Sequence, residues 1–234
     1  MTTTSSAATS AAEAGDSGLQ AVLLDMDGTL VDTEGFWWQA ERSLLAELGH
    51  RLDEADRARV VGGPMSRVVD YLIEATAVAL TAAELSLLIN QRFTELLVGG
   101  PPLMPGASRL LAELSAHRVP TALVSASHRP IIDMVLHTLG AEHFAFSVAG
   151  DEVARTKPHP DPYLLAATRL GVDPARCVVI EDALTGVRAA EAAGCTVIAV
   201  PSVTRIDAAP GRTVLDSLER VDLALLRGLV PSRL

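Results

Sequence analysis

The sequence predicts an α/β protein with a doubly wound parallel sheet and a helical unit inserted near its start. Short apolar runs alternate with helical patterns along most of the chain, and this alternation is typical of parallel sheets covered by helices. The first apolar run ends at Asp25 and the second begins near Pro120. That interval is far longer than the dozen or so residues that a crossover needs, so it must hold an additional unit.

The predicted core comprises residues 18–34 and 103–234. Its expected strands are 21–24, 119–125, 144–149, 177–181 and 196–200, and its expected helices are 106–117, 130–140, 161–171, 185–193 and about 217–229. Asp161 is the expected N-cap of its helix, because Pro162 then takes the first helical position.

The predicted insert, residues 35–102, shows recurring apolar faces at helical spacing. Four helices are expected, at 35–50, 53–61, 66–77 and 82–98, with Gly- and Pro-rich breaks between them. Hinges are expected near 33–35 and 101–106.

Two carboxylates, Asp25 and Asp27, directly follow the first predicted strand. Ligands of open α/β sheets bind outside the carboxyl ends of the strands, so this is the expected position of a site. Two like charges so close together need a cation or a shared proton. The structural alternative is a strand end closed by an Asx turn, in which Asp27 simply precedes Gly28.

Three later segments also place polar side chains at or just after predicted strands. Residues 119–127 (VPTALVSAS) end a strand at Ser125, and residues 177–194 (CVVIEDALTGVRAAEAAG) end one at Glu181 and Asp182. Between them, residues 154–163 (ARTKPHPDPY) carry Lys157 before a proline turn. Together with DMDGT at 25–29, the four segments occur in an order that resembles the phosphatases of the haloacid dehalogenase superfamily.

This resemblance, which covers the chain from about Gly18 onward, implies a Rossmann-like core with a small α-helical cap and a role for each motif. Asp25 is the expected nucleophile that becomes an aspartyl-phosphate, and Asp27 the expected general acid and base. Mg²⁺ is expected on Asp25, on Asp182 and on the backbone carbonyl of Asp27, with Glu181 supporting it through water. The expected phosphate-binding residues are Ser125, Lys157, Gly28 and Thr29.

Lys157 is distinctive in its own right, because it is the only lysine beside 18 arginines. An ammonium is a compact point charge, whereas a guanidinium is a wide planar fork. A tight site between carboxylates and a phosphate should therefore favour lysine.

The resemblance leaves three alternatives to a phosphatase. Haloacid dehalogenases lack the second Asp, so Asp27 argues against them. β-Phosphoglucomutases are the closer alternative, but they carry a His where this chain has Trp37, and no Lys or Arg occurs in residues 61–65, where their basic cap loop is expected. These mutases also carry Val or Ile-like residues at the position where this chain has Thr29. A phosphate-binding regulator without turnover is the third reading, and no residue pattern favours it.

The substrate is expected to be a small phosphorylated metabolite: a sugar phosphate, a phosphoglycolate-like acid or a nucleotide. Candidate specificity residues are Trp37, Ser66, Arg67 and His128. Adjacent helical positions point about 100° apart, so Trp37 and Trp38 cannot both face the site.

The composition limits the kinds of partner that the protein is expected to bind. The net charge of −10 argues against nucleic acid and anionic membranes as partners. The two cysteines and six histidines lack metal-ligand spacing, and the cysteines are typical of buried thiols in a cytoplasmic protein. Residues 1–17 are small and polar, and a disordered tail is expected there. A monomer or weak dimer is expected.

Overall fold

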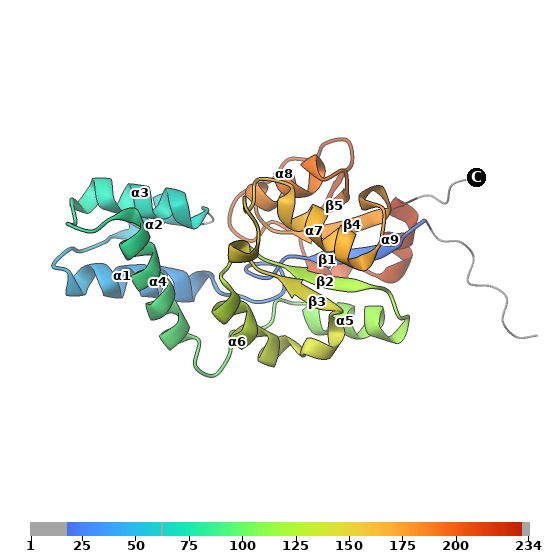
Figure 1. The fold of residues 1–234 in the computed structure, drawn as a ribbon, viewed down its shortest axis with the longest axis horizontal. Helices are drawn as coiled ribbons and strands as arrows, with labels where there is room; N and C mark the ends of the chain where they lie inside the picture. The colour runs from blue at the N-terminus through green and yellow to red at the C-terminus, as the bar shows by residue number, and fades with distance from the viewer. Residues whose placement is uncertain (1–17, 62, 231–234) are drawn as a thin grey trace, which may run out of the picture.

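The computed structural model describes residues 18–61 and 63–230, so the predicted tail at 1–17 lies outside the described residues. A six-stranded sheet forms the core, in the order β3-β2-β1-β4-β5-β6, with every neighbouring pair parallel (Figure 1). The strands are β1 (Ala21–Leu24), β2 (Thr121–Val124), β3 (Phe146–Val148), β4 (Cys177–Glu181), β5 (Thr196–Ala199) and β6 (Arg212–Val214). The predicted fold class is confirmed, with β1 at the centre of the sheet.

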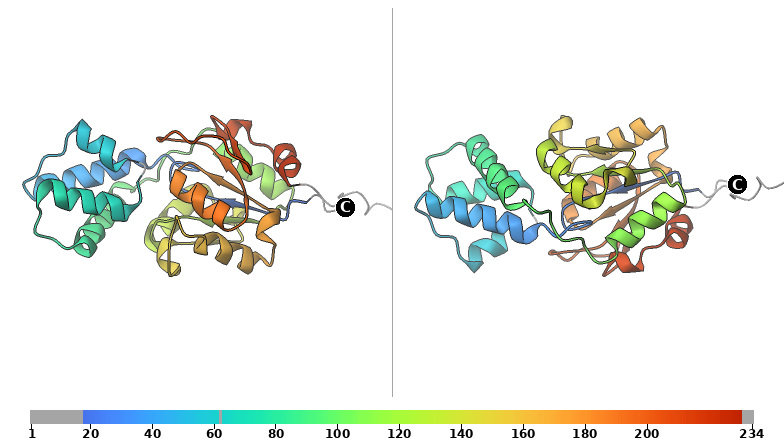
Figure 2. Two further views of the ribbon diagram at one scale, coloured as in Figure 1. Left: turned by 90° about the horizontal axis from the view of Figure 1, so that it is seen from above. Right: turned by 90° about the horizontal axis from the view of Figure 1, so that it is seen from below.

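Helices cover both faces of this sheet, because successive strand side chains point to opposite sides. Val22 and Leu24 pack into one apolar cluster, and Ala21 and Leu23 pack into the other. The first cluster includes side chains of α5 (Ala107–Ala116), α6 (Arg129–Leu139) and α9 (Leu223–Leu229). The second includes side chains of α7 (Asp161–Leu170) and α8 (Leu184–Ala192), and the two views of Figure 2 show these layers.

Four further helices lie together beyond the carboxyl ends of the strands (Figure 1). They are α1 (Glu34–Glu47), α2 (Glu54–Val60), α3 (Met65–Thr76) and α4 (Ala82–Leu96). The most extensive packing among them joins α1 to α4, and Trp38 and Phe93 are buried in their shared core. We call these four helices the cap. The two chain segments that join it to the core run side by side, since Asp32 N donates to Pro102 O at 2.8 Å and Met104 N to Leu30 O at 2.9 Å.

Two sequence expectations need correction, and one strand was not expected. Residues 217–229 form a 3₁₀ turn (Leu218–Arg220) followed by α9, because the Asp222 side chain caps a new helix at Leu225 N. Strand β6 was not expected, since its three residues are too few to show a pattern. Asp161 is the first residue of α7 rather than its N-cap, and its carboxylate pairs with Arg155 instead.

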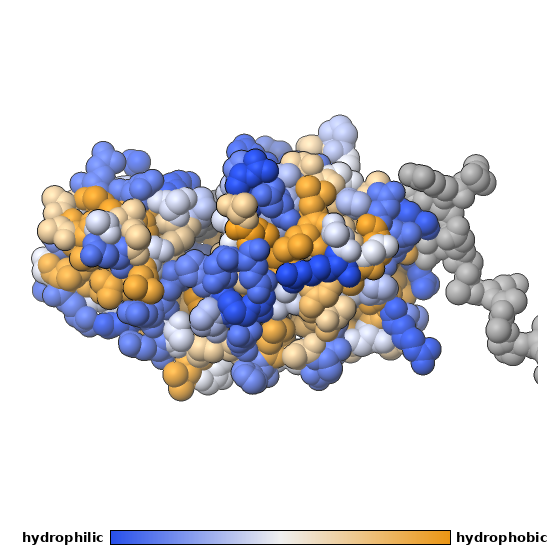
Figure 3. Space-filling view, in the orientation of Figure 1, coloured by the Kyte–Doolittle hydropathy of each residue, from blue (hydrophilic) through white to orange (hydrophobic). Residues whose placement is uncertain are grey.

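The surface mixes hydrophilic and hydrophobic residues over both the core and the cap (Figure 3). Within residues 18–61 and 63–230, no helix combines the length and apolar character that a membrane crossing requires.

Candidate active site

The carboxyl ends of the central strands bring the predicted acidic residues together. Leu24 of β1 pairs with Ile180 of β4, so Asp25 follows directly beside Glu181. Carboxylate oxygens of Asp25, Glu181 and Asp182 lie within 4.8 Å of one another, and all three side chains are buried. Ser125 follows β2 on the other side of β1.

Asp27 is held by three hydroxyl groups. Thr33 Oγ1 donates to its Oδ1 at 2.7 Å, and Ser127 and Ser125 donate to its Oδ2 at 2.8 and 3.3 Å. Burial raises the pKa of Asp27, and the nearby charge of Asp25 raises it further, while hydrogen bonds from Thr33, Ser127 and Trp37 act in the opposite direction. A protonated carboxyl held in a fixed orientation is suited to donate a proton.

Lys157 lies between the acidic strand ends. Its Nζ donates to Asp25 Oδ1 at 2.6 Å, to Glu181 Oε1 at 2.6 Å and to the Val124 carbonyl at 2.8 Å. Burial alone would lower the pKa of Lys157, but the charges of Asp25 and Glu181 raise it above its usual value. Because an ammonium has three donors, these contacts use all of them. Lys157 therefore offsets part of the carboxylates' negative charge and keeps its own charge in the cavity wall.

Glu181 and Asp182 have separate hydroxyl partners. The buried Tyr163 hydroxyl donates to Glu181 Oε1 at 2.6 Å, and the Ser202 hydroxyl donates to Asp182 Oδ2. Burial raises the pKa of both acids, and the charge of Asp25 raises both further. A Cβ on Gly186 would collide with the Glu181 carboxylate, so the close approach of α8 to this acid requires glycine.

Three buried carboxylates against one ammonium leave excess negative charge at this edge of the sheet. Their donors are all oxygen, which is the ligand type that hard divalent cations prefer. The donor set therefore fits a hard metal ion.

The turn after Asp27 is built around Gly28, whose φ of 77° favours glycine. A Cβ there would also collide with Asp182. The Gly28 amide donates to Val31 O and the Thr29 amide to Met26 O, so the turn itself uses these two donors. The buried Thr29 hydroxyl has no hydrogen-bond partner among the described residues. Neither Gly28 nor Thr29 lines the cavity described next, and their contact with phosphate stays a prediction.

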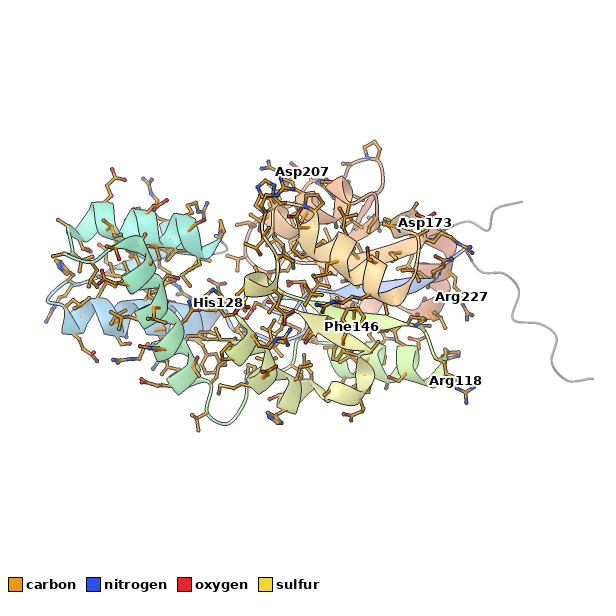
Figure 4. The ribbon with its side chains drawn as sticks, viewed as in Figure 1. Arg118, His128, Phe146, Asp173, Asp207 and Arg227 are labelled. Atoms are coloured by element: carbon orange, nitrogen blue, oxygen red, sulfur yellow. The ribbon has the colours of Figure 1, made fainter. Side chains whose placement is uncertain are left out.

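A cavity of about 180 Å³ opens over the strand ends and is lined by both the core and the cap. From the core come Asp25, Asp27, Ser125, Lys157 and Asp182, together with His128, which lies where α6 faces the cap (Figure 4). The cap closes the opposite side. The structure thus brings the predicted strand-end residues into one chamber.

Among the predicted specificity residues, Trp37 and His128 line the cavity. Trp37 stacks on Phe93 with ring centroids 3.6 Å apart, whereas Trp38 is buried inside the cap. Ser66 and Arg67 are exposed and are not among the residues that line the cavity, although the Arg67 guanidinium packs against Gly63, which is part of the lining.

Sequence reasoning missed several residues of the site. Thr33, Tyr163 and Ser202 hold its carboxylates, and Glu41 of α1 is a buried acid in the cavity wall. Ser202 shortly follows β5, so its position near a strand end was a usable signal. Tyr163 and Glu41 lie in helices and gave no comparable signal.

Comparison with known proteins identifies the family. A family model described as haloacid dehalogenase-like hydrolase matches residues 19–194. A bifunctional riboflavin kinase/FMN phosphatase from Arabidopsis thaliana is 38% identical over 79% of this chain and 49% of its own length, so the chain spans about half of that relative. Hexitol phosphatase A from Escherichia coli (strain K12) is 34% identical over 85% of this chain and 91% of its own.

A solved structure shows the same architecture. A mutant of CbbY from Rhodobacter sphaeroides, in complex with xylulose-(1,5)bisphosphate, has a TM-score of 0.77 and 31% identity over 89% of this chain and 99% of its own. The chain belongs to the haloacid dehalogenase-like hydrolase family. Within the family its relatives include named phosphatases, so the prediction of a phosphatase is confirmed at that level.

Proposed function

We propose that this protein hydrolyses the phosphate monoester of a small hydroxyl-rich metabolite, using Mg²⁺ and an aspartyl-phosphate on Asp25. The observation that carries the proposal is the single chamber in which Asp25 and Asp27 face the cap beside Lys157 and Ser125. The names of the relatives support the substrate class, because FMN, a hexitol and xylulose bisphosphate all carry several hydroxyl groups.

In the first step, Asp25 attacks phosphorus. Lys157 holds the carboxylate through Oδ1, so the attacking oxygen is Oδ2. The bond between phosphorus and the leaving oxygen breaks, and Asp27 gives its proton to that oxygen. Burial and the charge of Asp25 favour protonated Asp27 before this step by raising its pKa, which prepares it to act as the general acid.

In the second step, water hydrolyses the aspartyl-phosphate. Asp27, now ionised, takes a proton from the water as its oxygen attacks phosphorus. The bond from phosphorus to Asp25 Oδ2 breaks, and inorganic phosphate leaves. Thr33 and Ser127 keep the Asp27 carboxylate in one orientation through both proton transfers.

Asp25 and Asp182 are the proposed side-chain ligands of Mg²⁺, and the carbonyl of Asp27 is the proposed backbone ligand. When bound, the ion would supply positive charge against the phosphoryl oxygens. Glu181 accepts hydrogen bonds from Lys157 and Tyr163 on the same oxygen, so its role is to position Lys157 and to support the ion through water. Ser125 and Lys157 are the proposed phosphate contacts, and Lys157 Nζ would have to exchange one of its three present acceptors for a phosphoryl oxygen.

The remaining expectations are part of the same proposal. A cytoplasmic enzyme agrees with the buried free thiols of Cys177 and Cys195. No nucleic acid or membrane partner is proposed, and the protein is expected to act as a monomer or weak dimer.

The test is release of inorganic phosphate from a panel of sugar, polyol, acid and nucleotide phosphates, with and without EDTA. Asp25→Asn should lower kcat by at least about 1,000-fold, because the amide is a poor nucleophile. Asp32→Asn is the matched control, since Asp32 is an exposed carboxylate in the same loop, and it should keep wild-type activity. Near-normal turnover by Asp25→Asn would contradict the assignment, and an isomeric sugar phosphate formed in place of inorganic phosphate would indicate a mutase.

A further inference from the structure

Glu41 is a carboxylate in the cavity that the proposed reaction does not use. It projects from the middle of α1 and is only 4% exposed, yet it lines the cavity. No residue in the described part of the chain makes a hydrogen bond or ion pair with it. An acid buried without a partner costs stability, so its position calls for an explanation outside the chain's own packing.

The helix register points Glu41 toward the substrate chamber. Glu34, Trp37 and Glu41 follow one another at spacings of three and four, so they share one face of α1. All three line the cavity, while Trp38 and Leu45 face the interior of the cap. Glu41 therefore belongs to the wall opposite the strand ends, where the leaving group must lie when the phosphoryl group meets Asp25.

The charge in this wall selects against a second anion. Lys157 is the only lysine or arginine among the described residues that line the cavity, and its three donors are already used. A second phosphate or a carboxylate on the leaving group would meet no further lysine or arginine there, since His128 is the only other basic side chain in the described lining, and an unpaired buried charge is costly.

The same wall suits hydroxyl groups. Burial and the charge of Glu34 raise the pKa of Glu41 to about 8, so near neutral pH its carboxyl often keeps a proton and can both donate and accept. Apolar side chains of Trp37, Val60 and Met65 line the same cavity and offer surface for C–H groups. An ammonium ligand would need the ionised carboxylate, which burial disfavours.

We propose that Glu41 is a specificity-determining residue that hydrogen-bonds hydroxyl groups of a neutral polyhydroxy leaving group. The inference rests on the proposed phosphatase function and adds to it a substrate class and a residue that selects it. The cavity volume of about 180 Å³ is small beside the ~300–1,000 Å³ of pockets for drug-sized ligands, so a leaving group of three to six carbons fits the argument.

The experiment compares kcat/KM on glucose 6-phosphate, 6-phosphogluconate, glucosamine 6-phosphate, glycerol 3-phosphate and 3-phosphoglycerate, with p-nitrophenyl phosphate as a reference lacking the polyol. Wild type should prefer each neutral polyol phosphate over its carboxylate analogue by at least about 10-fold, the scale of one unpaired buried charge. Glu41→Ala should lower the ratio of polyol to p-nitrophenyl phosphate activity by about 10- to 100-fold, and Glu41→Gln should lower it less because it keeps hydrogen-bonding capacity.

Glu47→Gln makes the same chemical change on the same helix but outside the cavity, where Glu47 pairs with Arg92, and it should leave the ratio unchanged. Melting temperatures of all variants check folding, and Glu41→Gln keeps the test valid if Glu41→Ala unfolds. A wild-type preference for glucosamine 6-phosphate that Glu41→Gln removes would overturn the proposal in favour of an ammonium ligand. Hydrolysis of p-nitrophenyl phosphate with no polyol preference would overturn it while leaving the phosphatase function intact, whereas no hydrolysis at all would overturn both.

Discussion

The buried carboxylates on the core side of the cavity have hydrogen-bond or ion-pair partners, whereas the one on the cap side has none among the described residues. On the core side every acid has partners: Asp27 accepts from three hydroxyl groups, and Asp25 and Glu181 share the Lys157 ammonium. On the cap side Glu41 is equally buried and has no partner among the described residues. The core site is thus organised before substrate arrives, while the cap wall has an acid whose partner must come from outside.

The difference follows from the elements that carry each side. Parallel strands end in register, so their terminal side chains meet with little freedom, as preorganised electrostatic catalysis requires. The cap wall is a helix face, joined to the core by only two antiparallel segments. Under the proposed function, this division would place phosphoryl chemistry on the rigid sheet and the choice of leaving group on the cap.

The sharpest way to break the core arrangement is Lys157→Arg. The ammonium meets three oxygen atoms at 2.6–2.8 Å in a buried position, and a planar guanidinium cannot take that geometry without displacing one of them. We expect kcat/KM to fall by about 100- to 1,000-fold, nearly as much as in Lys157→Ala, because the buried carboxylates lose their hydrogen bonds to the ammonium.

The control for Lys157→Arg is Arg155→Lys, two residues earlier. Arg155 is 61% exposed and pairs with Asp161 at the surface, so exchanging its cation should leave phosphate release unchanged. Substantial activity in Lys157→Arg would show that only the positive charge matters there, and not its shape.

A smaller effect is expected from Tyr163→Phe, which removes one hydrogen bond from the same network. The Tyr163 hydroxyl fixes Glu181 Oε1, to which Lys157 also donates, so its loss should loosen both. We expect kcat to fall about 3- to 10-fold with KM little changed, and the free energy of unfolding to fall by about 1–2 kcal/mol. Steady-state kinetics and urea unfolding measure the two quantities.

Tyr71→Phe provides the comparison within the cap. The Tyr71 hydroxyl donates to Asp56 over 2.6 Å, and neither residue lines the cavity. This variant therefore loses a tyrosine–carboxylate hydrogen bond of the same length, in a less buried position. If both tyrosine variants lost the same stability but only Tyr163→Phe lost kcat, the positioning role of Tyr163 would be supported. Equal loss of kcat in both would point to general destabilisation instead.

The sequence was most informative about the core side. The Asp25, Ser125 and Asp182 positions follow from apolar runs that end in polar residues, and parallel pairing then brings them together. Lys157 could be singled out because it is the only lysine, and it was expected to bind phosphate. In the structure its Nζ donates to two carboxylates and a carbonyl.

The rest depended on tertiary contacts. Tyr163 reaches Glu181 because α7 packs against the sheet. Glu41 is buried by its tertiary surroundings, and its local sequence gives no sign of that burial. The expected contact of Ser66 and Arg67 with the leaving group depended on the first turn of α3, whose rotation no periodic pattern determines. Local sequence thus predicted the proposed reacting groups, which the fold brings together, but not the residues that hold them or the buried acid of the cap.

The last prediction concerns the free energy of unfolding of Glu41→Gln and of wild type, compared at two pH values. Burial raises the pKa of Glu41 from 4.5 to about 8, so the folded protein holds a proton that the unfolded chain releases above about pH 4.5. Wild-type stability from this group is complete below that pH and is lost as pH rises toward 8, whereas glutamine does not titrate. Relative to wild type, Glu41→Gln should therefore gain up to about 4 kcal/mol between pH 5 and pH 8.5. Glu47→Gln should instead lose nearly the same stability at both pH values, because hydrogen bonds from Arg92 lower the pKa of Glu47 and its stabilisation is present throughout the range above its unfolded value. Urea unfolding of the three proteins at both pH values makes the comparison. If Glu41→Gln gained nothing at the higher pH, the carboxyl would be solvated or paired, and the contrast between the two sides of the cavity would fail.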